Sequence, residues 1–264
     1  MSKGKRHINW RKLGRVAAWV VLIGATLVGT VAARFQQKAV TCTSIAIEVD
    51  YDDNVFFLDE QDIEQVISNF CGDSLPATRI HELDFNRLER RIEHDPYVLN
   101  AEIYSPRMGE LKVAVTQRQP ILRVINKAGV SYYIDEYGEK VPLSPKFTRR
   151  VPVASGHIPA VDQANVNSDT TVLHDIFKLI QHIRQDEFLH ALTEQVYVNE
   201  QGELELVPRL GDLVFVLGDI SELEQKFAKL QVFYREVGKS TNVNQYKTVN
   251  LKFKDQIVCT KKRS

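Results

Sequence analysis

The sequence predicts an α+β protein with an N-terminal transmembrane helix, a small β-α-α-β-β domain and a mainly antiparallel β domain that carries two helices. Three observations predict this class. Residues 16–33 contain no charged side chain, residues 44–117 change between strand-like and helix-like apolar spacing, and residues 118–258 contain short strand-like runs separated by turn residues. The chain is therefore expected to hold a membrane anchor followed by two folded domains.

The run Val16–Ala33 is expected to cross a membrane once, because a helix of this length spans roughly 27 Å, close to the thickness of the hydrocarbon core. The basic tail before it, residues 1–15, holds no acidic residue, which favours a cytoplasmic N-terminus. We assign residues 16–34 to the transmembrane helix, residues 35–43 to a linker and everything after them to the outer side. A cleaved secretory signal is the alternative, although its apolar run usually spans only about 7 to 15 residues.

The composition gives no sign of nucleic-acid binding, since 34 Lys and Arg balance 34 Asp and Glu. The three cysteines, Cys42, Cys71 and Cys259, are too few and too scattered for a disulfide scaffold or a zinc site. One pair could oxidise outside the cytoplasm, or all three could be small buried side chains. The cysteines therefore predict neither a scaffold nor a metal centre.

Signatures of catalysis are missing from the sequence. It contains no Gly-x-Gly-x-x-Gly, P-loop, Gly-x-Ser-x-Gly or His-Glu-x-x-His pattern. His174, His182 and His190 follow one another at a spacing that does not bring them to one helix face, as ligands at i and i+4 would be. We therefore expect no enzymatic activity, no cofactor and no metal site.

Residues 44–117 are predicted to form the first folded domain. Every second residue of Ser44–Asp50 is apolar, as in a half-buried strand. Two amphipathic helices follow, one opened by the N-cap candidate Asp59 and one opened by Asp84 and stopped by Asp95-Pro96. Strands near residues 98–104 and 110–116 complete the order, so the two helices are expected to pack on one face of a small sheet.

This order of elements resembles a POTRA domain. The resemblance is also carried by the segments DFNRLE, residues 84–89, and DPYVLNAEI, residues 95–103. In POTRA domains a P-x-V-x-x-A phrase likewise leads from the second helix into a strand. The resemblance implies that the surface of this domain contacts partner proteins.

Residues 118–258 are predicted to form the second domain. The segments Asn126–Gly129 and Asp135–Glu139 supply the turn residues between consecutive hairpin strands. Its elements are strands near residues 121–125, 131–134, 151–154, 195–198, 203–207, 213–217 and 246–254, and helices near residues 168–186 and 221–237.

Two motifs in this region resemble the FtsQ/DivIB family of cell-division proteins. The first is Arg118-Gln119-Pro120, directly after the POTRA-like part, and the second is YIDEYG, residues 133–138. The strand, helix and final strand over residues 213–254 also resemble the C-terminal half of these proteins. The resemblance therefore covers nearly the whole chain.

The resemblance implies a non-enzymatic scaffold of the cell-division machinery, the divisome. Such a scaffold lies in the cell inner membrane at the division septum, spans it once and exposes most of its chain to the periplasm. The implied partners are FtsB and FtsL homologues and other divisome membrane proteins of the septal peptidoglycan synthase complex. Through them the scaffold helps to control septal peptidoglycan synthesis.

The final predicted strand, Tyr246–Lys254, is the candidate partner site. As the last element it could offer an open edge to an extended segment, or be an ordinary edge protected by its lysines. The resemblance favours the first reading, because FtsQ proteins add a strand from FtsB here. It implies the partner-binding residues Tyr246, Thr248, Asn250, Leu251, Lys252, Phe253, Gln256, Ile257 and Val258. The chain departs from the family pattern in its basic C-terminal tail, residues 259–264.

Two other classes stay open at this point. A POTRA-containing accessory protein of outer-membrane assembly or secretion would normally hold several such domains and a membrane barrel. An anchored cell-wall enzyme would need a nucleophile, a metal or a carboxylate pair in a cleft. A structure that lacks such a cluster would argue against the second class.

Overall fold

The computed structural model describes residues 19, 21–27, 41–51, 55–72, 80, 83–107, 109–159, 166, 171–240 and 243–262, which fall into two compact units. Within this part of the chain, none of the helices combines the length and the apolar character needed to cross a bilayer. Most of the predicted transmembrane helix Val16–Ala33 lies outside the described residues. Its described part, Trp19 and residues 21–27, is helical, and Leu22 and Ile23 are more than half exposed.

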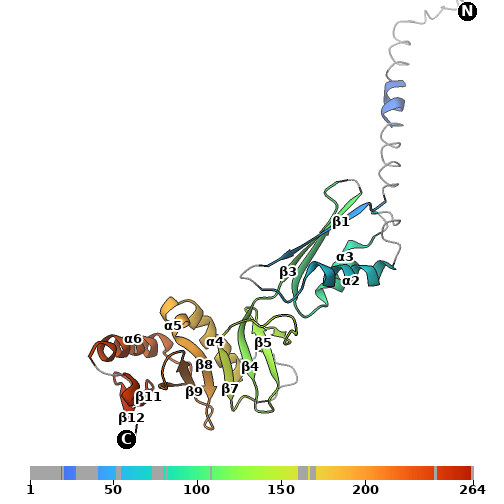
Figure 1. Ribbon diagram of the computed structural model, residues 1–264. Coiled ribbons are helices and arrows are strands. Elements are labelled where there is room, and N and C mark those ends of the chain that lie inside the picture. The colour runs from blue at the N-terminus through green and yellow to red at the C-terminus, as the bar shows by residue number, and fades with distance from the viewer. Residues whose placement is uncertain are drawn as a thin grey trace, which may run out of the picture. The chain divides into compact units, whose positions relative to one another are not determined.

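The first unit contains a three-stranded sheet with the strand order β1-β3-β2. Helices α2 (Glu60–Cys71) and α3 (Phe85–Glu93) lie side by side against it (Figure 1), and they bury Ile63, Ile67, Leu88 and Ile92. The strands are β1 (Ser44–Asp50), β2 (Val98–Tyr104) and β3 (Glu110–Gln117). The predicted order strand, helix, helix, strand, strand is confirmed.

Local capping explains where α3 begins. Asp84 precedes the helix with an extended backbone, and its carboxylate accepts a hydrogen bond from the backbone N–H of Arg87 at 3.0 Å. This bond satisfies one of the amides that the first helical turn leaves without a partner. The second helix was predicted to begin at Asp84, and the structure places Asp84 at its N-cap.

The second unit is built on a nine-stranded sheet with the order β12-β11-β10-β9-β8-β7-β4-β5-β6. The pairs β4–β7, β7–β8 and β10–β11 are parallel, and the others are antiparallel. The strands are β4 (Pro120–Ile125), β5 (Ser131–Asp135), β6 (Lys140–Val141), β7 (Val153–Gly156), β8 (Thr193–Val198), β9 (Leu204–Pro208), β10 (Val214–Gly218), β11 (Tyr246–Asn250) and β12 (Val258–Lys261). The predicted class, α+β with a mainly antiparallel second domain, is confirmed for this sheet.

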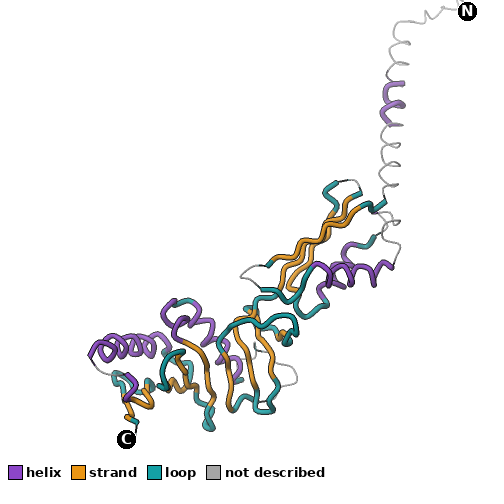
Figure 2. The backbone as a smooth tube through the Cα atoms, viewed as in Figure 1, coloured by secondary structure: helices purple, strands orange, loops and turns teal. Residues whose placement is uncertain are grey.

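Three helices cover one face of the large sheet: α4 (Val172–Arg184), α5 (Glu187–Leu192) and α6 (Leu223–Ser240). Figure 2 shows them in purple along one side of the orange strands. Alternate strand residues such as Val196, Phe215 and Val249 point into the shared core, where α6 adds Phe227 and Leu230. This alternation follows from the period-two geometry of a strand.

The prediction of two helices in this domain was wrong, because α5 is a third. The chain leaves α4 at Gln185, and Asp186 starts a new helix by accepting a hydrogen bond from the N–H of Leu189 at 3.0 Å. The sequence signal was Asp186, a second N-cap residue directly after α4. Such a residue is easily mistaken for the end of the preceding helix. The predicted start at Ser168 lies outside the described residues, and α4 is capped by Thr171.

The two family-like motifs of the sequence meet at the start of β4. Arg118 Nη1 lies 2.7 Å from Oδ2 of Asp135, whose side chain is fully buried. The other oxygen, Oδ1, accepts the N–H groups of Tyr137 at 3.0 Å and Glu139 at 2.8 Å. One carboxylate therefore shapes the β5–β6 hairpin and ties it to the segment that leads into β4.

Candidate protein-binding edge

The predicted partner-binding residues lie in the last two strands and in the loop between them. Three of them, Tyr246, Thr248 and Asn250, belong to β11, Val258 begins β12, and the others form the connection. β11 pairs with β10 in parallel, with Val214 opposite Thr248, and with β12 in antiparallel fashion, with Thr260 opposite Thr248. β11 is thus an inner strand of the sheet.

Two sequence expectations about this region need correction. The predicted strand Tyr246–Lys254 ends at Asn250 and is not the edge, and residues 259–261, assigned to a basic tail, belong to β12. The signal for β12 was present, since Ile257, Val258 and Thr260 are β-branched residues of the kind that strands favour.

Polar contacts explain why β11 stops at Asn250. The side-chain Oδ1 of Asn250 accepts the N–H of Lys252 at 3.0 Å, which turns the backbone. Nζ of Lys229, on α6, donates to the carbonyl oxygens of Leu251 at 2.5 Å and Phe253 at 2.8 Å. Asp255 then takes a left-handed φ of 56°, a conformation that Asp tolerates better than most residues, and the chain returns as β12.

β12 ends the sheet, and no described strand lies beyond it. Its inner side pairs with β11, and the bond from Lys262 N–H to the carbonyl of Gln245 at 2.8 Å extends that pairing. Cys259 is half-buried on the helix-covered face, opposite Val249, while Val258 is 44% exposed. The outer backbone of β12 therefore offers donors and acceptors next to apolar surface.

The surface near this edge is apolar and basic. Phe253, in the loop, is 49% exposed. Lys254 and Lys261 are exposed as well, whereas Nζ of Lys262 lies 3.1 Å from Asp212 Oδ2. An extended segment with acidic and apolar side chains would complement this surface.

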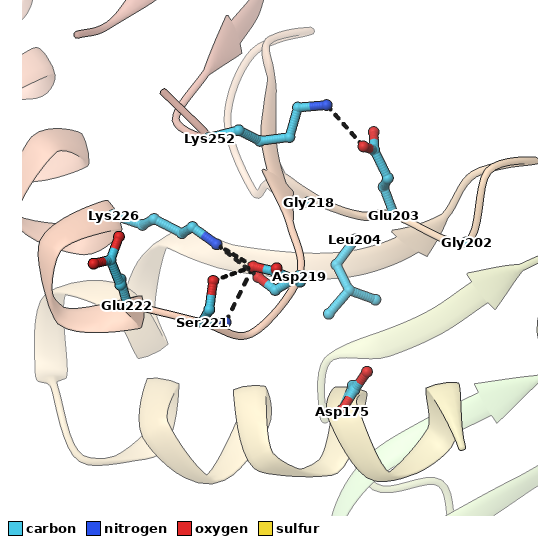
Figure 3. Close-up of a pocket in the computed structure, with 10 residues that line it drawn as sticks. All are labelled: Asp175, Gly202, Glu203, Leu204, Gly218, Asp219, Ser221, Glu222, Lys226 and Lys252. Atoms are coloured by element: carbon cyan, nitrogen blue, oxygen red, sulfur yellow. Dashed lines mark hydrogen bonds and ion pairs between the residues drawn. The ribbon is translucent and has the colours of Figure 1, made fainter. Parts of the chain in front are cut away.

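A pocket of about 290 Å³ lies beside the loop, at the start of β9 and the end of β10. Figure 3 shows Lys226 of α6 pointing at Asp219, and the two side chains approach to 2.7 Å. Lys226 is buried, its Nζ also donates to the carbonyl of Asp219 at 2.9 Å, and Ser221 Oγ donates to Asp219 Oδ1 at 2.5 Å. The hydrogen bonds from Lys226 and Ser221 lower the pKa of Asp219 to about 2.

Lys252, one of the predicted partner-binding residues, points into this pocket (Figure 3). Its Nζ lies 2.7 Å from Glu203 Oε1, and this hydrogen bond lowers the pKa of Glu203. The side chain crosses Gly218 so closely that a Cβ there would lie 2.7 Å from Lys252 Cδ. The ion pair between Lys252 and Glu203 holds the β11–β12 loop against β9. The close approach of the Lys252 side chain requires glycine at position 218.

The chemistry of the remaining candidates is limited. Among the described residues, no three His, Cys, Asp or Glu side chains gather as metal ligands would. Cys42, Cys71 and Cys259 are free thiols, and burial raises the pKa of each, which disfavours the reactive thiolate. Burial likewise raises the pKa of Asp175 in the pocket.

Comparison with known proteins identifies the class first. Residues 40–116 match the family model of a POTRA-like domain, so the chain belongs to the proteins that contain such a domain. Residues 119–260, more than half of the chain, match the model described as "FtsQ/DivIB, C-terminal related". The chain belongs to the FtsQ/DivIB family.

One curated relative is the "Cell division protein FtsQ" of Syntrophotalea carbinolica. It is 27% identical over 191 residues, which cover 68% of this chain. The match spans 63% of that relative, less than two thirds of its length.

Proposed function

We propose that this protein is a non-enzymatic scaffold of cell division that binds FtsB and FtsL homologues through the outer edge of β12. The observation that carries the proposal is the position of β12 at the end of the nine-stranded sheet, with Val258 44% exposed. An extended partner segment would continue the sheet, with main-chain hydrogen bonds giving affinity and side-chain contacts giving specificity. The curated name of the relative supports the division role.

The anchor completes this proposal. The helix predicted for Val16–Ala33 would hold the chain in the inner membrane at the septum, with residues 1–15 in the cytoplasm and both folded units in the periplasm. Through FtsB, FtsL and other divisome membrane proteins, the scaffold would help to control septal peptidoglycan synthesis. The exposed apolar side chains of residues 21–27 support an environment of lipid rather than water.

The alternative role in outer-membrane assembly or secretion has weaker support. It would rest on the POTRA-like domain alone, whereas the second domain matches a family of the division machinery. The proposal therefore concerns the second domain, where the open edge lies.

Amide hydrogen exchange on the full-length chain tests the proposal, with and without the periplasmic segments of the FtsB and FtsL homologues. We expect protection at residues 257–262, on the outer strand. Val258→Asp should abolish it, because a charge would enter the apolar contact. The matched control is Val130→Asp, since Val130 is 52% exposed in the β4–β5 turn, away from the edge. Protection confined to other elements, or none at saturating partner, would refute edge binding.

A further inference from the structure

A second pocket, of about 260 Å³, lies in the second unit. It occurs where β4 begins, β7 is about to begin and β9 has just ended, and α4 ends there too. Its polar lining consists of basic side chains from three separate segments and α5: Arg149, Arg150, Arg184, Arg209 and His190. Within the part of the chain that the structure describes, no acidic residue lines it.

Such a gathering of guanidinium groups is unfavourable unless anions offset it, because like charges repel at short range. Among the described residues, the carboxylate of Glu194 partly does so, since its Oε2 lies 3.4 Å from Nε of Arg209. Arg150 and Arg184, both exposed, form no ion pair with any described residue. The pocket therefore has unused capacity for negatively charged groups.

The geometry favours carboxylates over phosphate. Phosphate sites in proteins usually use the backbone N–H groups of a helix N-terminus. Here α4 contributes its C-terminal end, where the partial negative charge of the helix opposes a compact dianion. Separate carboxylates, each paired with its own arginine, would avoid that repulsion. Arg209 already forms such an ion pair with Glu194.

We propose that this pocket binds an acidic segment of a partner protein, with neighbouring Asp or Glu side chains each received by one arginine. Arg clusters recognise acidic motifs in this way because the guanidinium offers a planar fork of donors. In the sheet order, β10 and β11 separate β9 from β12, so the pocket is distinct from the proposed strand-binding edge. The chain would then contact its partners at two places.

Fluorescence anisotropy of the full-length chain tests this, with a labelled peptide of four consecutive glutamates as the probe, at constant ionic strength. The double variant Arg150→Gln/Arg184→Gln should bind about a hundredfold more weakly, since each lost charge-assisted hydrogen bond costs about tenfold. The peptide affinity of Arg184→Lys should lie between those of the unmodified chain and the double variant, because lysine keeps the positive charge but lacks the planar set of guanidinium donors. Arg235→Gln, which removes an exposed arginine of α6 outside the pocket, is the matched control.

The outcomes are separable. Binding that is unchanged in the double variant, or weakened equally by Arg235→Gln, would show general attraction to positive charge and overturn the proposal. Displacement of the peptide by millimolar inorganic phosphate at the same ionic strength would also overturn it, in favour of a phosphate site. Val258→Asp should leave peptide binding unchanged, so a failure here is distinguishable from a failure of the edge proposal.

Discussion

The buried carboxylate of Asp135 is the single residue on which the hairpins of the second unit most depend. It pairs with Arg118 and accepts two backbone N–H groups. Asp135→Asn keeps one acceptor oxygen but turns an amide donor toward the guanidinium. We expect a loss of about 3 kcal/mol in the free energy of unfolding, as when one partner of a buried ion pair is removed. Urea denaturation measures this change.

The control for this prediction is an exposed pair of the same kind. Lys146 and Asp59 lie 3.1 Å apart, with side chains 47% and 49% exposed. Asp59→Asn should cost less than about 1 kcal/mol, because solvent screens the attraction. Equal losses in the two variants would mean that burial does not decide the strength of the Asp135 pair.

Asp219 gives a prediction about pH. Its pKa is lowered from 3.8 to about 2, so its stabilising contribution is present above pH 3.8 and is lost as the pH falls toward 2. The effect is small, because the carboxylate side chain is 73% exposed. Asp219→Asn should therefore make the free energy of unfolding fall less between pH 5 and pH 2. Urea denaturation at each pH measures this change.

A neighbour in the same pocket provides the comparison. Glu222 lines the pocket and forms no ion pair with a described residue. Glu222→Gln should leave the decline of the free energy of unfolding between pH 5 and pH 2 as it is in the unmodified chain. If both variants flatten the curve alike, the contact between Lys226 and Asp219 is not its cause.

At the scale of elements, the two sheets differ in how their edge strands are protected from pairing with another chain. In the first unit, β2 ends the sheet and is covered by α3, since Glu89 accepts the N–H of Ile103 at 2.8 Å and Glu93 that of Ala101 at 3.4 Å. In the second unit, β6 ends one side with only two residues. Short strands and charged covers are common devices against unwanted pairing. Two edge strands have no such cover among the described residues: β1, with seven residues, and β12, with four, at which we propose that the partner binds.

The sequence predicted most of these elements, because apolar periodicity reports local burial directly. It predicted the β-α-α-β-β order and seven of the nine strands of the second unit within a few residues, but neither β6 nor β12. It did not predict the end of β11 at Asn250, because that end depends on Lys229 reaching two carbonyls from a different element. It also did not reveal the arginine pocket, whose members lie far apart along the chain and meet only through the sheet topology.

At the scale of the whole molecule, the chain joins an apolar N-terminal run to two units that carry their own cores. Cores such as that of the second unit bury aromatic and branched side chains, as water-soluble domains do. The side chains of residues 21–27 are instead exposed although Val21, Leu22, Ile23 and Leu27 are strongly apolar. The membrane anchor proposed above would place these side chains in lipid.

Charged substitutions in that helical stretch give the last prediction. Leu22→Asp/Ile23→Asp should release the full-length chain from the membrane fraction, because each acidic residue near the centre of a span costs about 3 kcal/mol of insertion free energy. Carbonate extraction of cell membranes measures the bound share. Leu210→Asp is the matched control, since Leu210 is 86% exposed in the second unit and should not affect anchoring. Membrane retention of the double variant would mean that another part of the chain, or a partner, holds it there.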